Sequence, residues 1–152
     1  MAGLSLPAYF SYLKWPVKIV PTKDGGAAAW QLSPETGGWQ AAHHLIDDII
    51  FDVGGEVDVL TAEEFVQLVE RRRGERVSGD GAVFALYETV NGIEEVAESE
   101  RRRLTDSERS LVHALRRRTF RMFEEALSAA GDPAADSGVG LGGSTTGIDG
   151  SL

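Results

Sequence analysis

Apolar residues recur with a helical period between Thr105 and Ala130. They are spaced three, four and seven residues apart, which places them on one side of an α-helix. Thr105 followed three residues later by Glu108 forms a capping box at the start, and Gly131 and Pro133 end the pattern. We therefore predict a long amphipathic helix, with a buried stripe formed by Leu111, Val112, Leu115, Thr119, Met122, Phe123, Ala126 and Ala130.

Three earlier segments also favour helices. Apolar positions in residues 41–51 fit a short helix better than a strand. A second capping box begins at Thr61, and three arginines followed by Gly74 are typical of a helix end. Residues 82–102 keep helical spacing, although residues 83–90 also fit a strand that ends at an Asn-Gly turn. We prefer the helix, which would form a helical hairpin with the helix that follows it.

The N-terminal part has the pattern of a small antiparallel sheet. Residues 17–20 alternate with a period of two, residues 27–32 suit a return strand, and residues 39–40 suit a third short strand. Glycine-containing turns separate these segments. The predicted fold class is α+β: a short antiparallel β-meander, then three to four helices packed on one of its faces. We expect the three tryptophans of this region to lie in the core: Trp15, Trp30 and Trp39.

Length and composition predict one domain and a tail. The chain has 152 residues, and residues 1–131 contain the periodic patterns of a single α+β domain. Residues 132–152 are rich in Gly, Ser and Asp and have little to bury, so we expect a disordered tail. The chain has no cysteine, which excludes disulfides, thiolate catalysis and cysteine-ligated metals.

The net charge of −9 is unevenly distributed. Residues 61–100 hold four Arg and ten acidic residues, a balance of −6, whereas residues 101–130 hold eight Arg and four acidic residues, a balance of +4. An acidic body repels phosphate backbones, so we do not expect general nucleic-acid binding. The sequence has neither a signal-peptide pattern nor an apolar run of membrane-spanning length, so we expect a cytoplasmic protein without a membrane contact.

One face of the predicted long helix is a candidate for partner binding. It carries Arg116, Arg117, Phe120 and Arg121, residue types that are enriched at binding hot spots, although a purely solvated face is the alternative. No catalytic motif accompanies it. We therefore predict a small acidic, non-enzymatic module that binds another protein, such as an immunity-type inhibitor, adaptor or regulator. The sequence leaves the identity of that protein and the oligomeric state open.

Two other functions remain as alternatives. The first is a nucleic-acid-associated factor that uses the Arg-rich segment 101–121. The second is a metal-dependent enzyme, because helical spacing would pair His44 with Asp48 and His43 with Asp47 as ligands. The sequence marks no third or fourth ligand, so we predict no metal and no cofactor, and His44 and Asp48 remain weak candidates.

Overall fold

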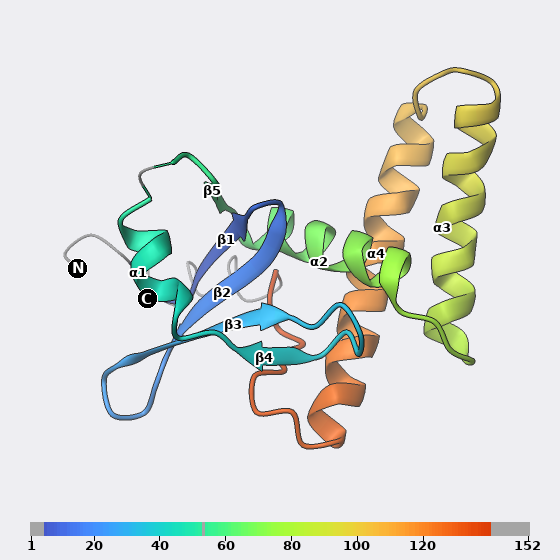
Figure 1. Ribbon diagram of the computed structural model, residues 1–152. Coiled ribbons are helices and arrows are strands. Elements are labelled where there is room, and N and C mark those ends of the chain that lie inside the picture. The colour runs from blue at the N-terminus through green and yellow to red at the C-terminus, as the bar shows by residue number, and fades with distance from the viewer. Residues whose placement is uncertain (1–4, 53, 141–152) are drawn as a thin grey trace, which may run out of the picture.

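A computed structural model describes residues 5–52 and 54–140 and shows a five-stranded antiparallel sheet with four helices (Figure 1). The strands stand in the order β4-β3-β2-β1-β5. Their bounds are β1 Ala8–Tyr12, β2 Trp15–Pro21, β3 Ala27–Leu32, β4 Trp39–Ala41 and β5 Val57–Leu60. The α+β class, the antiparallel meander and the three predicted strands are confirmed.

Two strands of the sheet were not predicted. β1 pairs with β2 and extends the meander at its beginning, with Phe10 opposite Val17. β5 returns to the free edge of β1, where Leu60 lies opposite Tyr9. The chain reaches that edge through a crossover that includes a short helix. The sheet is therefore wider than the short meander expected from the sequence.

The helices begin and end close to the predicted residues. Their bounds are α1 Leu45–Ile50, α2 Ala62–Arg76, α3 Ala82–Ser99 and α4 Asp106–Ala129. Both capping boxes form: the hydroxyls of Thr61 and Thr105 accept bonds from the backbone N–H three residues later, and the glutamates there accept from the threonine N–H. Residues 83–90 are helical, and α3 and α4 form the predicted hairpin. Gly74 lies inside α2 and does not end it.

Helices cover both faces of the sheet, which corrects the expectation that they pack on one face. On the first face, Leu45 and Ile49 of α1 pack against a core that includes Phe10 and Ile19. On the second face, α2 and α4 contribute Phe65 and Phe120 to a separate core. Trp39 belongs to this second core, and Trp15 and Trp30 pack against it, as predicted for the three tryptophans.

Residues 132–140 pack against the second core, which corrects the boundary predicted for a disordered tail. Ala134 and Val139 are buried, and the carboxylate of Asp132 accepts a bond from the backbone N–H of Trp39 at 3.0 Å. The segment contributes few apolar side chains, but its backbone bonds to buried charged groups hold it in place. The rest of the predicted tail, residues 141–152, lies outside the described residues.

Candidate functional site

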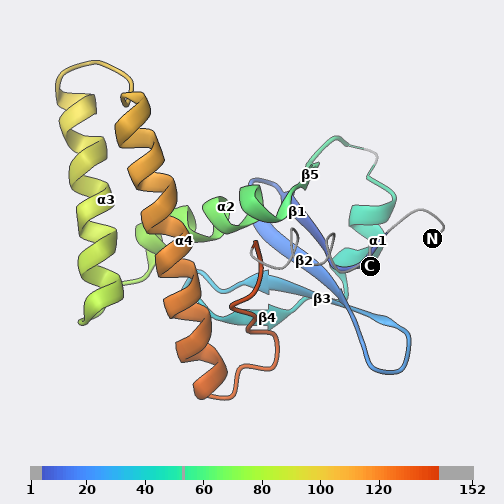
Figure 2. The ribbon, with the colours of Figure 1, turned by 180° about the vertical axis from the view of Figure 1, so that it is seen from behind.

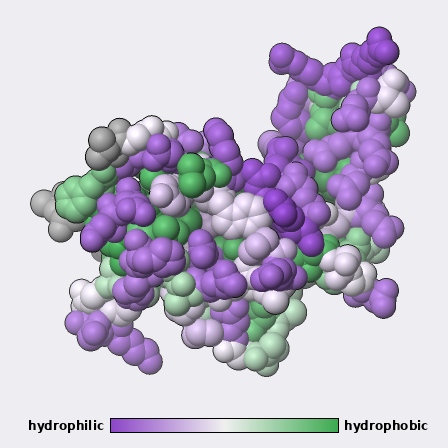
Figure 3. Space-filling view, viewed as in Figure 1, coloured by the Kyte–Doolittle hydropathy of each residue, from purple (hydrophilic) through white to green (hydrophobic). Residues whose placement is uncertain are grey.

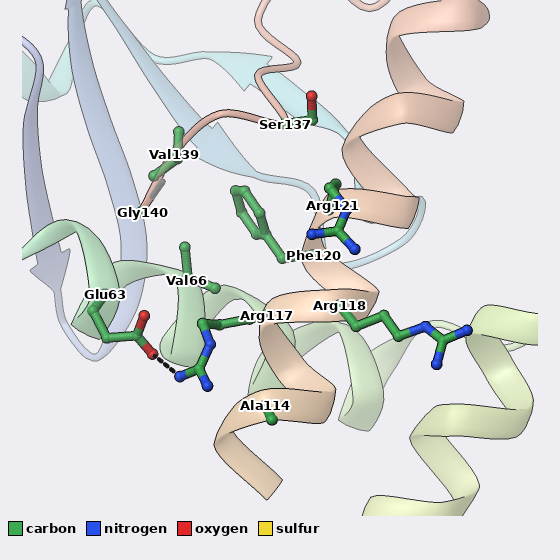
Figure 4. A pocket seen from close by; sticks show the side chains of 10 residues that line it. All are labelled: Glu63, Val66, Ala114, Arg117, Arg118, Phe120, Arg121, Ser137, Val139 and Gly140. Carbon is green, nitrogen blue, oxygen red and sulfur yellow. Dashed lines mark hydrogen bonds and ion pairs between the residues drawn. The ribbon is translucent and has the colours of Figure 1, made fainter. Parts of the chain in front are cut away.

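A groove of about 190 Å³ lies between α2, α4 and residues 137–140 (Figure 4). Its floor is apolar and its rim is charged, a combination that suits a ligand with one apolar side chain and charges around it. Three of the four arginine and phenylalanine positions predicted for partner binding line it. The lining residues are Glu63, Val66, Ala114, Arg117, Arg118, Phe120, Arg121, Ser137, Val139 and Gly140.

The floor and the rim come from different elements. Val66 of α2, Phe120 of α4 and Val139 are buried and belong to the second core. On the rim, Arg117 Nη1 lies 3.4 Å from a carboxylate oxygen of Glu63, and both side chains are about half exposed. Figure 4 shows Arg121 beside the Phe120 ring, whereas the Arg118 side chain extends away from the other lining residues. The rim therefore offers at least two guanidinium groups to an anionic ligand.

The four predicted partner-binding residues do not share one exposed face. Arg117 and Arg121 are exposed, but Phe120 is 1% exposed and Arg116 is 6% exposed. Arg116 points toward α3, where its Nη2 lies 3.2 Å from the carboxylate of Glu94. Burial lowers the pKa of Arg116, and the Glu94 carboxylate opposes that effect. Arg116 is therefore a buried structural residue, and Phe120 is part of the groove floor.

The buried side of α4 also contains a charged residue, Glu124. Glu124 has no exposed area, and its carboxylate pairs with Arg73 of α2 at 2.5 Å. Arg73 is equally buried and also donates to Glu70 at 2.9 Å and to the Gly37 carbonyl at 2.9 Å. Its guanidinium carbon lies 4.1 Å from the centre of the Phe123 ring. One arginine thus joins two helices and the β3–β4 turn.

This ion network also holds the wall of the groove. Glu124 accepts a bond from the indole N–H of Trp39 at 3.1 Å and from the backbone N–H of Asp136 at 2.8 Å. Lys18 lies over the Trp39 ring and donates to the Ala134 carbonyl. These bonds fix residues 134–136, and the next residues form the groove wall. The buried charges of Lys18 and Glu124 therefore hold the groove wall in position.

Burial perturbs the ionisation of this network. It raises the pKa of the Glu70 carboxyl, although the Arg73 guanidinium and the Tyr87 hydroxyl, which donates at 2.8 Å, oppose the shift. Burial alone would lower the pKa of Arg73, but Glu70 and Glu124 raise it above its usual value. Burial lowers the pKa of Lys18. These groups are enclosed and mutually bonded, so the network has a structural role.

A close approach of chain segments explains one glycine in this region. Gly37 has a φ of +77°, and a Cβ there would lie 2.7 Å from the Phe123 ring. Its carbonyl is the third acceptor for Arg73. The sequence predicts the turn but not this contact, because Gly37 and Phe123 are distant in the sequence.

The segment 101–121, which we considered for nucleic-acid binding, has eight arginines, and four of them form ion pairs. Arg102 bonds Glu100 and Glu108, and Arg109 bonds Asp106. With Arg116 and Arg117 also paired, the cationic surface of the hairpin is partly neutralised. Within residues 54–140, the exposed arginines of this segment with no ion pair are Arg101, Arg103, Arg118 and Arg121.

The candidate metal residues lie at the start of α1 and are exposed. His43 and His44 precede the helix, whose first residue is Leu45, so the helical pairing with Asp47 and Asp48 begins outside it. The Tyr12 hydroxyl approaches Asp48 at 3.5 Å. Among residues 5–52 and 54–140, no group of three or more His, Cys, Asp or Glu side chains is placed to hold a metal ion.

Comparison of the chain with models of known protein families, with curated proteins and with solved structures finds no match. In the described part of the chain, no helix is both long enough and apolar enough to span a bilayer.

Proposed function

We propose that the protein is a non-enzymatic binding module whose groove receives an acidic segment of another protein. The observation that carries this proposal is the joint placement of an apolar floor and cationic side chains on the rim. An apolar side chain of the partner would fill the space over Phe120 and Val139. Carboxylates on either side of it would meet Arg117 and Arg121.

Charge complementarity favours an acidic ligand over a basic or neutral one. Arg121 has no ion-pair partner among the described residues. Arg117 pairs with Glu63, but the distance from its Nη1 to the carboxylate oxygen is 3.4 Å, which is long for an ion pair. A carboxylate from a partner would therefore add a charge-assisted hydrogen bond without breaking a strong existing pair. The acidic remainder of the chain would repel an acidic partner elsewhere, which would favour docking at this rim.

Fluorescence anisotropy with short labelled peptides tests the proposal. The main probe alternates Glu or Asp with Leu and Phe. One comparison peptide replaces the acids with Lys, and a second replaces the apolar residues with Ser. We expect only the first peptide to bind, with an affinity that falls between about 50 and 300 mM salt because the contacts are partly electrostatic.

Arg121→Glu is the diagnostic variant, and Arg103→Glu is its matched control. Both change the chain charge equally, but Arg103 lies in the α3–α4 connection, away from the groove. Arg121→Glu should weaken the acidic peptide at least about tenfold, whereas Arg103→Glu should leave binding within about twofold. Equal weakening by both variants would indicate a non-specific charge effect. Tighter binding of a single-stranded oligonucleotide than of the peptide would favour a nucleic-acid function instead.

A further inference from the structure

The α3–α4 hairpin extends beyond the sheet, and only one of its faces is directed toward α2 (Figures 1 and 2). On that inner face, the Tyr87 hydroxyl of α3 donates to Glu70 of α2, and Phe120 and Glu124 of α4 reach the second core and Arg73. In the view from behind, α4 lies in front of α2, so this view shows the outer face of the hairpin (Figure 2).

An apolar stripe runs along the outer face. On α4, helical geometry places Leu111, Leu115 and Met122 opposite Phe120 and Glu124. On α3, the outer positions are Leu86, Ile93 and Val96. Val96 and Leu111 are each 48% exposed, and the other four side chains are only partly buried. By contrast, the side of the hairpin seen in Figure 3 is mostly hydrophilic. The outer stripe is therefore an apolar layer without a covering element among the described residues.

We propose that this stripe is the interface of a homodimer, in which two hairpins pack face to face as a four-helix bundle. Two antiparallel helices with one apolar face are half of such a bundle. A two-fold axis parallel to the helices would stack α3 of one copy on α4 of its partner, with both turns at the same end. The bodies of the two copies would then lie on opposite sides of the bundle.

The charges of the two helices favour a second copy as the occupant. α3 carries four Glu and no basic residue, whereas the exposed Arg118 lies next to the stripe on α4. Stacking α3 on α4 of the partner brings the acidic helix α3 toward the exposed Arg118, while stacking α3 on α3 would oppose like charges. The two-fold arrangement makes the same surface complementary to itself, as an isologous interface requires.

The size of the surface predicts a dimer that depends on concentration. The 18 residues of α3 span about 27 Å, and two helices side by side are about 20 Å wide. The contact would therefore cover about 500 Å² on each copy, near the lower end of specific interfaces. We expect reversible association in the micromolar range rather than a permanent dimer.

Sedimentation equilibrium of the full chain tests the proposal. The apparent mass should rise from 16.4 kDa toward twice that value between about 1 and 200 µM protein. Leu111→Asp should weaken the dimer at least about tenfold, with circular dichroism confirming that this half-exposed position tolerates the change. Val59→Asp, on the edge strand β5 at a position 78% exposed, is the matched control and should leave association unchanged.

Cysteine cross-linking tests the stacking order, because the chain has no cysteine of its own. Val96→Cys and Leu111→Cys are prepared separately, mixed and oxidised. The proposed stacking predicts the mixed disulfide as the main product, because α3 of one copy lies on α4 of the other. A monomer at all concentrations, or loss of the dimer in Val59→Asp but not in Leu111→Asp, would overturn the proposal. Predominant like-with-like disulfides would overturn the stacking order.

Discussion

Replacement of Arg73 by methionine should strongly destabilise the protein. Methionine fills most of the aliphatic volume but removes the guanidinium that contacts both Glu70 and Glu124. It also leaves the Gly37 carbonyl without this donor. Removal of one member of a buried ion pair costs several kcal/mol, because the remaining charge stays desolvated and unpaired.

We expect Arg73→Met to lower the free energy of unfolding by about 4 kcal/mol, which is a large part of the total for a domain of this size. In urea, that loss corresponds to a midpoint lowered by roughly 2 M. Arg71→Met is the matched control, because Arg71 lies two residues earlier on the same helix and is exposed. The control should change stability by less than about 0.5 kcal/mol.

The pH dependence separates a charge effect from a packing effect. Burial raises the pKa of Glu70 and Arg73 opposes that shift, so without Arg73 the folded-state pKa of Glu70 should rise further above its unfolded value of about 4.3. A group with a raised folded pKa stabilises the fold below its unfolded pKa, and that contribution is lost as pH rises through the folded pKa. Urea unfolding should therefore show a smaller deficit for Arg73→Met at pH 5 than at pH 8. A loss below about 1 kcal/mol, or an equal loss at both pH values, would refute the proposed role of Arg73 as countercharge.

Three further predictions concern the cap of α4 and the C-terminal segment. Thr105→Ala should lower the free energy of unfolding by about 1 kcal/mol, measured by thermal unfolding, because the helix loses its N-cap acceptor. Arg102 and the backbone N–H of Thr105 lower the pKa of Glu108 to about 2. The contribution of Glu108 to stability is therefore present above its unfolded pKa and is lost as pH falls toward 2. An NMR titration should show this pKa, and Arg102→Gln should raise it. Truncation after Gly131 should lower the free energy of unfolding in urea by about 3 kcal/mol. The buried carboxylate of Glu124 loses the backbone N–H of Asp136, and the buried side chains of Ala134 and Val139 are removed. Truncation after Gly140 leaves these contacts intact and is the control. Equal stability of the two truncated chains would contradict this packing.

The helices could be predicted because their signals are local. Thr61 and Thr105 each act on a residue three positions away, so the caps are complete within a few residues of sequence. β5 has no comparable signal: it has four residues, and its pairing partner Tyr9 lies about fifty positions before Leu60. β1 was missed for a different reason. It pairs with β2 through a two-residue turn, and the turn residues Leu13 and Lys14 have φ values of 52° and 68° without being the Gly, Asn or Asp that normally mark such a turn.

The candidate site could be predicted only in part. Arg117 and Arg121 are exposed because no buried partner reaches them, and their positions follow from helical periodicity. Glu124 broke the rule that charged residues mark the solvent side, because its partner Arg73 lies 51 residues earlier on another helix. The groove wall at residues 137–140 was missed because the low apolar content of this segment predicts disorder. What holds the segment are backbone bonds just before it to Lys18 and Glu124, which are distant in the sequence.

The single helix α4 supplies three surfaces whose separation follows from its geometry. Phe120 and Glu124 face α2, Arg121 lies at the groove, and Leu111 lies on the outer stripe. At 3.6 residues per turn, the groove positions and the stripe lie about 100° apart around the axis, with the core on the remaining side. A peptide in the groove and a second copy on the stripe would therefore occupy different faces of the same helix. Leu111→Asp should consequently weaken the dimer and leave peptide binding unchanged, and Arg121→Glu should weaken peptide binding and leave the dimer unchanged, so each proposal can fail while the other stands.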